Sequence, residues 1–219
     1  METIRERLEL MEKKSRLFSL LAKALNYPDR DLEEKVSKGA FRRDLAESLR
    51  PFSRNGLLKQ VESLKRSGAE VFGDNREDRL LDLERDYTWM CFASKPRLVY
   101  LFESVYKEGR LLQESTFEMA RLYYEAGLKV NEGFQLPPDH IAVELEFMAY
   151  LYYQEAEALR QGDGEKEHYA RQLQEAVIEK HLRPFGLSFS ERMEKHAKTD
   201  FYRIMARVLR EALTSESMN

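Results

Sequence analysis

The chain contains 219 residues, of which 42% are hydrophobic and 34% are charged, and its formal net charge is −3. A chain of this length buries a substantial core, and this composition is typical of a globular protein rather than a disordered one. The slightly acidic balance argues against a nucleic-acid surface, which requires a basic stripe. It is compatible with a local acidic patch that receives a basic peptide.

The sequence shows no signal for export or for a membrane span. The first ten residues, METIRERLEL, are rich in charge and lack the apolar core of a signal peptide. No apolar run approaches the roughly 18 residues that a transmembrane helix needs. Cys91 is the only cysteine, which excludes an intramolecular disulfide and favours a small buried side chain. We therefore expect a cytoplasmic protein without stable membrane insertion.

Helical periodicity dominates the N-terminal half of the chain. Apolar residues from Leu8 to Leu25 predict a first helix, which Pro28 ends because proline disfavours helix in the residue before it. Pro96 marks the end of the last helix of this half, and the stretch from there to Gly109 is the least regular in the chain. Between Pro28 and Pro96, three more helices are expected, over 29–36, about 57–68 and about 77–92.

The C-terminal half continues this pattern. Ser115 and Glu118 have the spacing of a capping box, which predicts a helix start, and Gly127 is placed to end that helix. The segment RPFGLSFS is expected to separate the last two helices. Three further helices are expected, over 139–161, one that ends near His181, and one over about 191–213.

No segment alternates polar and apolar residues over the length of a strand, and no internal repeat or low-complexity tract is present. The sequence therefore predicts an all-α protein, built as a bundle of about eight to ten helices. No flexible linker divides the chain, so residues 1–219 are expected to form a single domain.

The motif PPDH, residues 137–140, precedes the most apolar helix of the chain. Its two prolines end one segment, and Asp139 and His140 then stand at the mouth of a buried helix. Asp139 is either an N-cap, which accepts from free backbone N–H groups, or a functional acid. His140 alone is more typical of a structural hydrogen-bonding histidine than of a catalyst.

Glu144 lies one helical turn after His140. At about 100° per residue these two residues share one stripe, whereas Glu146 points almost opposite to Glu144, so the two glutamates form no facing acid/base pair. A glutamate on a central apolar helix must be paired, and His140 is its nearest local partner. A metal site is not expected, because further ligands at a recognisable spacing are missing, and the phosphate-loop and serine-elbow motifs are absent too.

Two other clusters supply candidate binding residues. The sequence ERDYTWMCF contains Tyr87, Trp89 and Phe92, and a surface of aromatic residues and methionine adapts to varied apolar peptides. The alternative for these residues is ordinary core packing. The sequence ESVY places Glu103 and Tyr106 in the irregular stretch, where Glu103 is a binding acid, a solvated side chain or a helix cap.

Two separated blocks, ESVY…GRLLQESTFEMARLYYEAGL and PPDHIAVELEFMAYL, resemble the TorD/DmsD family of molybdoenzyme chaperones, to which NarJ is more distantly related. DYTWMCF is similar to the aromatic helix of that family, and HLRPF…FYRIMARVL is similar to its C-terminal helices. The resemblance covers about Leu17 to Leu213 and is strongest from Glu103 to Leu151. Two blocks in this order are far more specific than one short motif.

This resemblance implies a TorD-like bundle without catalysis or cofactor. It implies a cytoplasmic, system-specific chaperone, a monomer or a homodimer. Such a chaperone binds the twin-arginine leader or the apo-form of a molybdopterin-containing oxidoreductase subunit, and it aids maturation, cofactor insertion and assembly before export. Some members bind guanine nucleotide, but no phosphate loop is present here, so none is expected. The candidate leader- or client-binding residues are Tyr87, Glu103, Tyr106, Asp139, His140 and Glu144.

We expect acids such as Asp86, Glu103 and Asp139, partly exposed, to pair with the arginines of a leader, while an apolar groove takes the remainder. Two alternatives stay open. One is a non-catalytic scaffold or assembly subunit of an oxidoreductase complex. The other is a small helical enzyme that uses Asp139 and His140 as an acid/base dyad.

Overall fold

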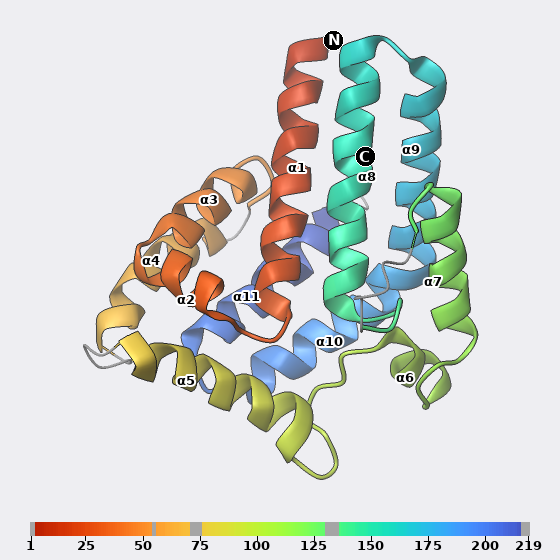
Figure 1. Ribbon diagram of the computed structural model, residues 1–219. Coiled ribbons are helices and arrows are strands. Elements are labelled where there is room, and N and C mark those ends of the chain that lie inside the picture. The colour runs from red at the N-terminus through yellow and green to blue at the C-terminus, as the bar shows by residue number, and fades with distance from the viewer. Residues whose placement is uncertain (1–2, 54–55, 71–75, 130–135, 216–219) are drawn as a thin grey trace. The chain divides into compact units, whose positions relative to one another are not determined.

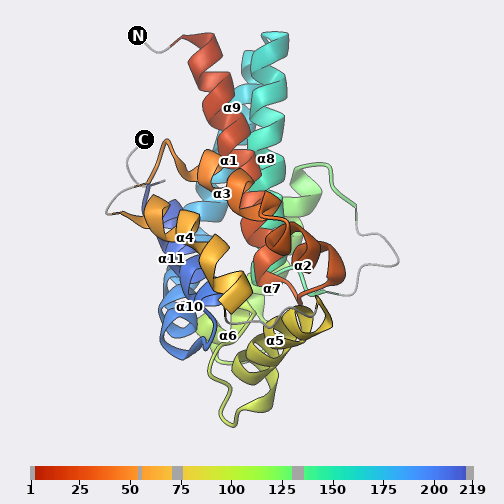
Figure 2. The ribbon, with the colours of Figure 1, turned by 90° about the vertical axis from the view of Figure 1, so that its left-hand side faces the viewer.

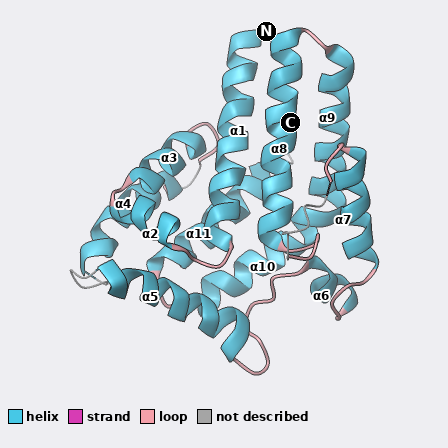
Figure 3. Cartoon of the chain, viewed as in Figure 1, coloured by secondary structure: helices cyan, strands magenta, loops and turns pink. Residues whose placement is uncertain are grey.

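The structure is a computed structural model, and it describes residues 3–53, 56–70, 76–129 and 136–215, with backbone alone for 65–70 and 76–78. These residues form helices and connecting segments, and a single bridge between Phe102 and His140 is the extended pairing among them (Figure 3). The predicted all-α class is thereby confirmed. The chain divides into two compact units, residues 1–22 with 102–185 and residues 23–101 with 186–219, so each unit is described by itself.

The first unit contains three long helices that run side by side, α1, α8 and α9 (Figures 1 and 2). The Phe18 ring stacks on Tyr152 at 5.6 Å, and the Ser15 hydroxyl donates to the carbonyl of Ala149 at 2.8 Å. The helices of this unit are α1 (Ile4–Leu25, as far as Ala22), α6 (Glu103–Glu108), α7 (Glu114–Glu125), α8 (Ile141–Gln161), α9 (Gly164–Val177), the π-helical turn η2 (Ile178–Leu182) and the first turn of α10 (Arg183–His196).

Helix α8 is the most buried helix of this unit, as its nearly continuous apolar sequence predicts. It begins at Ile141 and ends at Gln161, and Gly162 follows with a φ of 68°, a left-handed conformation that suits a glycine after a helix. The expected helix over 139–161 is therefore confirmed, with its first turn starting two residues later. Asp139 and His140 lie just outside the helix, at its N-terminal end.

The second unit contains shorter helices around an aromatic core. Phe41 contacts Phe201 at 5.8 Å between ring centroids, and Tyr87 contacts Tyr202 at 5.9 Å. Helix α3 in this unit has no counterpart in the sequence prediction. The helices are α2 (Arg30–Ser37), α3 (Ala40–Leu49), α4 (Leu57–Glu70), α5 (Arg76–Thr88), the π-helical turn η1 (Trp89–Ala93), the remainder of α10 and α11 (Asp200–Ser215).

The boundary predicted between the last two helices is wrong. The segment RPFGLSFS lies inside α10, because Pro184 falls directly after the π-helical turn η2, where its missing N–H interrupts little. The break instead falls at 197–199, before α11. The capping box predicted from Ser115 and Glu118 is wrong too, since the backbone N–H and hydroxyl of Ser115 both donate to Glu108, at 3.2 and 3.0 Å.

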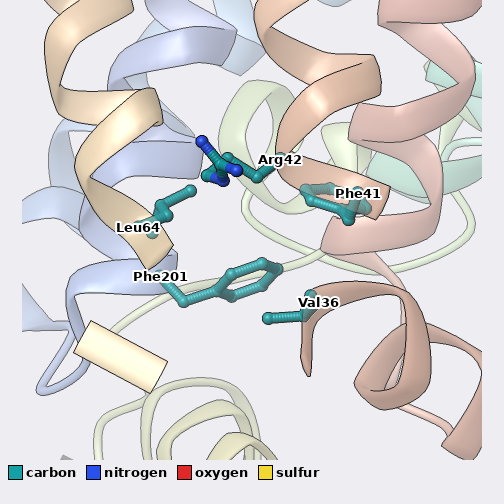
Figure 4. Close-up of a pocket in the computed structure, with 5 residues that line it drawn as sticks. All are labelled: Val36, Phe41, Arg42, Leu64 and Phe201. Carbon is teal, nitrogen blue, oxygen red and sulfur yellow. The ribbon is translucent and has the colours of Figure 1, made fainter. Parts of the chain in front are cut away.

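The second unit also contains a small pocket between α2, α3, α4 and α11 (Figure 4). Its free space holds about one water molecule, so it is too small to receive a peptide side chain. The lining residues are Val36, Phe41, Arg42, Leu64 and Phe201. None of the helices that the structure describes combines the length and the apolar content of a membrane-crossing segment.

Candidate functional site

Asp139 joins the two sequence blocks of the first unit. Its backbone carbonyl accepts from the N–H of Glu103 at 2.9 Å, and its carboxylate Oδ2 accepts from the N–H of Ser104 at 3.0 Å. Both donors are free N–H groups at the start of α6, so Asp139 caps a helix that lies 35 residues earlier. The interpretation of Asp139 as the N-cap of its own following helix is therefore wrong. The carboxylate links ESVY to PPDH.

His140 caps α8 in place of Asp139. Its Nδ1 accepts from the backbone N–H of Ala142 at 3.1 Å, which requires a neutral ring with the proton on Nε2. Burial lowers the pKa of His140 to about 4, against the opposing charge of Asp139. The ring also meets Phe102 edge-on at 5.3 Å. His140 is a structural hydrogen-bonding histidine here, and the expected pair with Glu144 does not form among the described contacts.

Glu103 is buried, and both of its carboxylate oxygens have hydrogen-bond or ion-pair partners. Its carboxylate oxygens lie 3.0 and 3.1 Å from Nδ1 of His181, and Oε1 lies 2.7 Å from Nζ of Lys107. Lys107 also donates to the carbonyl of Lys180 at 2.7 Å, which ties α6 to η2. His181 and Lys107 belong to this site although the sequence patterns gave no sign of either. His181 lies 78 residues from its partner Glu103 in the sequence. Lys107 lies one turn after Glu103, but α6 is too short for its pattern to be recognised.

Glu144 is a buried carboxyl group without a hydrogen-bond partner among the described residues, on either oxygen. Burial raises its pKa well above the usual range, and the charges of Glu103 and Asp139 raise it further, against the effect of Lys107. This environment favours the protonated form of the Glu144 carboxyl group. Burial likewise raises the pKa of Tyr123, whose hydroxyl donates to the carbonyl of Pro138 at 2.6 Å.

These side chains form a closed buried region rather than an open binding site. Glu103, Asp139 and Glu144 are each fully buried, and His140 is nearly so. Tyr106 is half-buried, with its ring 5.2 Å from Phe185. The expectation that Glu103 and Asp139 are partly exposed is therefore wrong, because solvent does not reach their carboxylates in this structure. We call this group of residues the buried polar centre.

The same holds in the second unit for Asp86 and Tyr87. Asp86 accepts from the N–H and the hydroxyl of Thr199, both at 2.7 Å, and from the N–H of Lys198 at 3.0 Å. It therefore holds Lys198 and Thr199, the two residues that directly precede α11, and the Thr199 hydroxyl in turn accepts from the N–H of Tyr202 in the first turn of that helix. Tyr87 is buried as well, and its hydroxyl donates to the carbonyl of Leu25 at 3.1 Å. Both residues support the fold of this unit.

The π-helical turn η1 brings other aromatic residues to the surface. Trp89 is 42% exposed and Phe92 is 47% exposed, while Met90 and Cys91 on the same turn are buried. Lys198 lies over the Trp89 ring at 4.3 Å, and Arg97 lies 5.9 Å from the Phe92 ring. Burial, together with Asp86, raises the pKa of Cys91 to about 12, which makes it an inert thiol.

The buried polar centre lacks the geometry of an acid/base dyad. The Asp139 carboxylate faces Ser104 instead of His140, and the Nδ1 of His140 is used in capping. Among the described residues, no group of histidine, cysteine and carboxylate side chains has the arrangement of a metal site. What the centre does is hold three segments together, namely the start of α6, the start of α8 and η2.

Comparison with known proteins assigns the class. Residues 54–191, more than half of the chain, match the family model described as the nitrate reductase delta subunit. The chain belongs to this family, which includes the TorD-type chaperones of redox enzyme maturation. The resemblance seen in the sequence blocks is therefore confirmed. The chain is a chaperone-family protein and not an enzyme.

Curated relatives of this chain are named chaperone protein TorD. The chaperone protein TorD of Vibrio vulnificus CMCP6 is 26% identical over 200 residues, which cover 88% of this chain and 86% of that protein. The TorD of Photobacterium profundum is 32% identical over 130 residues, or 58% of each chain. A crystal structure of a redox enzyme maturation protein from Archaeoglobus fulgidus matches 93% of this chain and 94% of its own with a TM-score of 0.53, at 21% identity. That match supports the helical fold.

Proposed function

We propose that this protein is a cytoplasmic chaperone that binds the twin-arginine leader, the apo-form, or both, of a molybdopterin-containing oxidoreductase subunit before export. Membership of the TorD-type family supports the chaperone role. The leader fits as a ligand because it joins arginines to an apolar stretch, and this chain combines apolar surface residues with acidic ones. The protein then protects the subunit during cofactor insertion and assembly.

The observation that carries this proposal is the exposure of large apolar side chains on well-formed helices. Trp89 and Phe92 on η1 and Phe117 and Tyr124 on α7 are all more than 40% exposed, although the core has other aromatic residues fully buried. Exposed aromatic side chains that gather at a surface are typical of interaction sites. Apolar burial then supplies most of the affinity, at roughly 1.5–3 kcal/mol per large side chain fully buried, less the cost of ordering the peptide.

The buried polar centre has a positioning role in this proposal. Asp139, His140 and Glu103 hold α6 and α8 in place, and substitutions there change binding by changing the support of the surface helices. The proposed client-binding role of Tyr87, Glu103, Tyr106, Asp139, His140 and Glu144 is therefore indirect.

Titration calorimetry with three synthetic leader peptides tests the proposal. The wild-type peptide is expected to bind, the twin-lysine peptide to bind somewhat more weakly, and a peptide with serine in place of its Leu and Phe residues to lose binding. A twin-lysine peptide that loses nearly all affinity while the serine peptide binds normally would contradict apolar recognition. Failure of every leader peptide to bind would remove the leader from the proposal.

A scaffold subunit of an oxidoreductase complex is the second candidate, and the family description as a delta subunit favours it. The two functions differ in the mature complex, because a chaperone leaves it and a scaffold stays. Affinity purification of the exported, cofactor-loaded oxidoreductase separates them. Stoichiometric retention of this protein in that complex is the result that a scaffold requires.

A further inference from the structure

Helix α7 of the first unit presents an unused apolar edge. Phe117 is 60% exposed and Tyr124 is 77% exposed. At about 100° per residue, these two side chains point within about 20° of each other and away from the buried face formed by Ser115, Thr116 and Met119. They lie two turns apart along one side of the helix, which we call the apolar stripe, with Ala120 and Arg121 on the turn between them.

The loop directly before α7 carries two exposed leucines. Leu111 is 46% exposed, and Leu112 is 59% exposed at a φ of 56°, a left-handed conformation that costs about 1 kcal/mol or more for a residue with a branched side chain. The Gln113 amide holds this loop by donating to the carbonyls of Leu111 and Leu112 at 2.7 and 3.1 Å. A strained leucine that is held out into solvent costs stability without contributing to the core, which is typical of a binding element.

Acidic residues line the other edge of the same helix. Glu114 and Glu125 are exposed, and the Glu118 side chain is 46% exposed. By the same helical geometry these three carboxylates lie within about 40° of one another, and the single guanidinium of Arg121 lies between them and the two aromatic residues. The exposed face of α7 is thus apolar along one edge and net negative along the other.

We propose that the α7 surface, formed by Leu111, Leu112, Phe117, Tyr124, Glu114, Glu118 and Glu125, docks the cationic and apolar segment of the client's leader. This rests on the proposed function and assigns it a location. The choice follows from charge, because the aromatic residues of η1 are accompanied by cations, Lys198 over Trp89 and Arg97 beside Phe92, which repel arginines. On α7 the apolar stripe takes the leader's apolar stretch, and the acidic edge takes its arginines.

Fluorescence anisotropy with a labelled twin-arginine leader peptide and the full chain tests the proposal. Replacing both aromatic residues, Phe117→Ser with Tyr124→Ser, is expected to weaken binding at least ~30-fold. Replacing the acids, Glu114→Gln with Glu118→Gln and Glu125→Gln, is expected to weaken it about fivefold at low salt and by less than about twofold in 0.5 M salt.

The controls match residue type and exposure. Tyr153→Ser on α8 replaces another half-exposed tyrosine of the same unit, and Glu175→Gln on α9 replaces another exposed acid. Trp89→Ser with Phe92→Ser removes the competing aromatic surface. Tyr153→Ser and Glu175→Gln are expected to bind the peptide within about twofold of the wild type, since surface changes outside an interface have small effects. The variant with Trp89→Ser and Phe92→Ser is expected to lose less affinity than the variant with Phe117→Ser and Tyr124→Ser.

Leu112→Gly separates binding from folding. Glycine adopts a positive φ without strain, so this variant is expected to unfold at an equal or higher urea concentration than the wild type. It also lacks the exposed side chain, so peptide binding is expected to fall about fivefold. A residue with only a structural role would not lose binding while stability is kept.

The outcomes distinguish this inference from the function on which it rests. Normal binding by the α7 variants, with binding lost in the Trp89 and Phe92 variant, overturns the location and leaves leader binding intact. A wild-type protein that binds no leader peptide overturns both. Self-association that depends on Phe117 and Tyr124, without peptide binding, would show that a second copy of the chain occupies this surface and would also overturn the proposal.

Discussion

Replacing Asp86 with alanine is expected to destabilise the fold by roughly 2–6 kcal/mol. The carboxylate accepts from the N–H and hydroxyl of Thr199, both at 2.7 Å, and from the N–H of Lys198. The Thr199 donors are buried, so each loses a charge-assisted partner that water does not replace, at about 1–3 kcal/mol per donor. Lys198 is exposed, and its N–H is rehydrated at little cost.

Urea unfolding, followed by circular dichroism, measures this loss. Asp86→Asn retains an acceptor oxygen and is expected to lose less than the alanine variant. Asp82→Ala is the matched control, since Asp82 lies one turn earlier on α5 and pairs with Arg85 at 3.5 Å near the surface. Its expected effect is about 0.5 kcal/mol or less. A loss below about 1 kcal/mol for Asp86→Ala would refute the conclusion that Asp86 holds the segment before α11 in place.

Two further predictions concern the buried polar centre. Burial raises the pKa of Glu144 above its unfolded value of 4.5, so the wild type loses stability as the pH rises above 4.5. Glu144→Gln cannot ionise, so its stability relative to the wild type should increase from pH 5 to pH 8. Urea midpoints with the same pH profile in both proteins would contradict a raised pKa for Glu144. His140→Ala removes the cap of α8 and is expected to cost about 1–2 kcal/mol, whereas His140→Asn keeps a capping acceptor and should cost less. Because the pKa of His140 falls from 6.5 to about 4 on folding, the wild type should also lose stability relative to His140→Asn as the pH falls from 6.5 to 4, and the absence of this difference in urea midpoints would argue against a buried neutral ring.

The helices of this chain are largely predictable because their signals are local. The apolar repeat from Leu8 to Leu25, with Pro28 after it, marked the end of α1, and Gly127 follows the end of α7 with a φ of 78°. The long apolar helix after PPDH appears as α8. Periodicity and turn residues carry this information within a few positions of each boundary.

The roles of the candidate site residues depend on partners that lie far away in the sequence. Asp139 was expected to cap the helix beside it but caps α6, and Glu103 binds His181 at a separation of 78 residues. Ser115 forms its bonds with Glu108 instead of taking part in a capping box. No local pattern distinguishes such a distant partner from the nearest one. The exposed edge of α7 was missed because a helix with polar and apolar residues on several sides gives no clear indication of which face the core covers.

The division of the chain into units has a consequence for its synthesis. Each unit combines an earlier and a later segment, residues 1–22 with 102–185 and residues 23–101 with 186–219. The ribosome therefore releases the start of α1 long before the helices that bury it, on the order of ten seconds at roughly 5–20 residues per second. The first unit lacks its last helical turns until residue 185 has been made, and the second unit lacks α11 until residue 215 has been made. Both units are therefore completed late in synthesis, and the nascent chain exposes apolar helices until these C-terminal segments emerge.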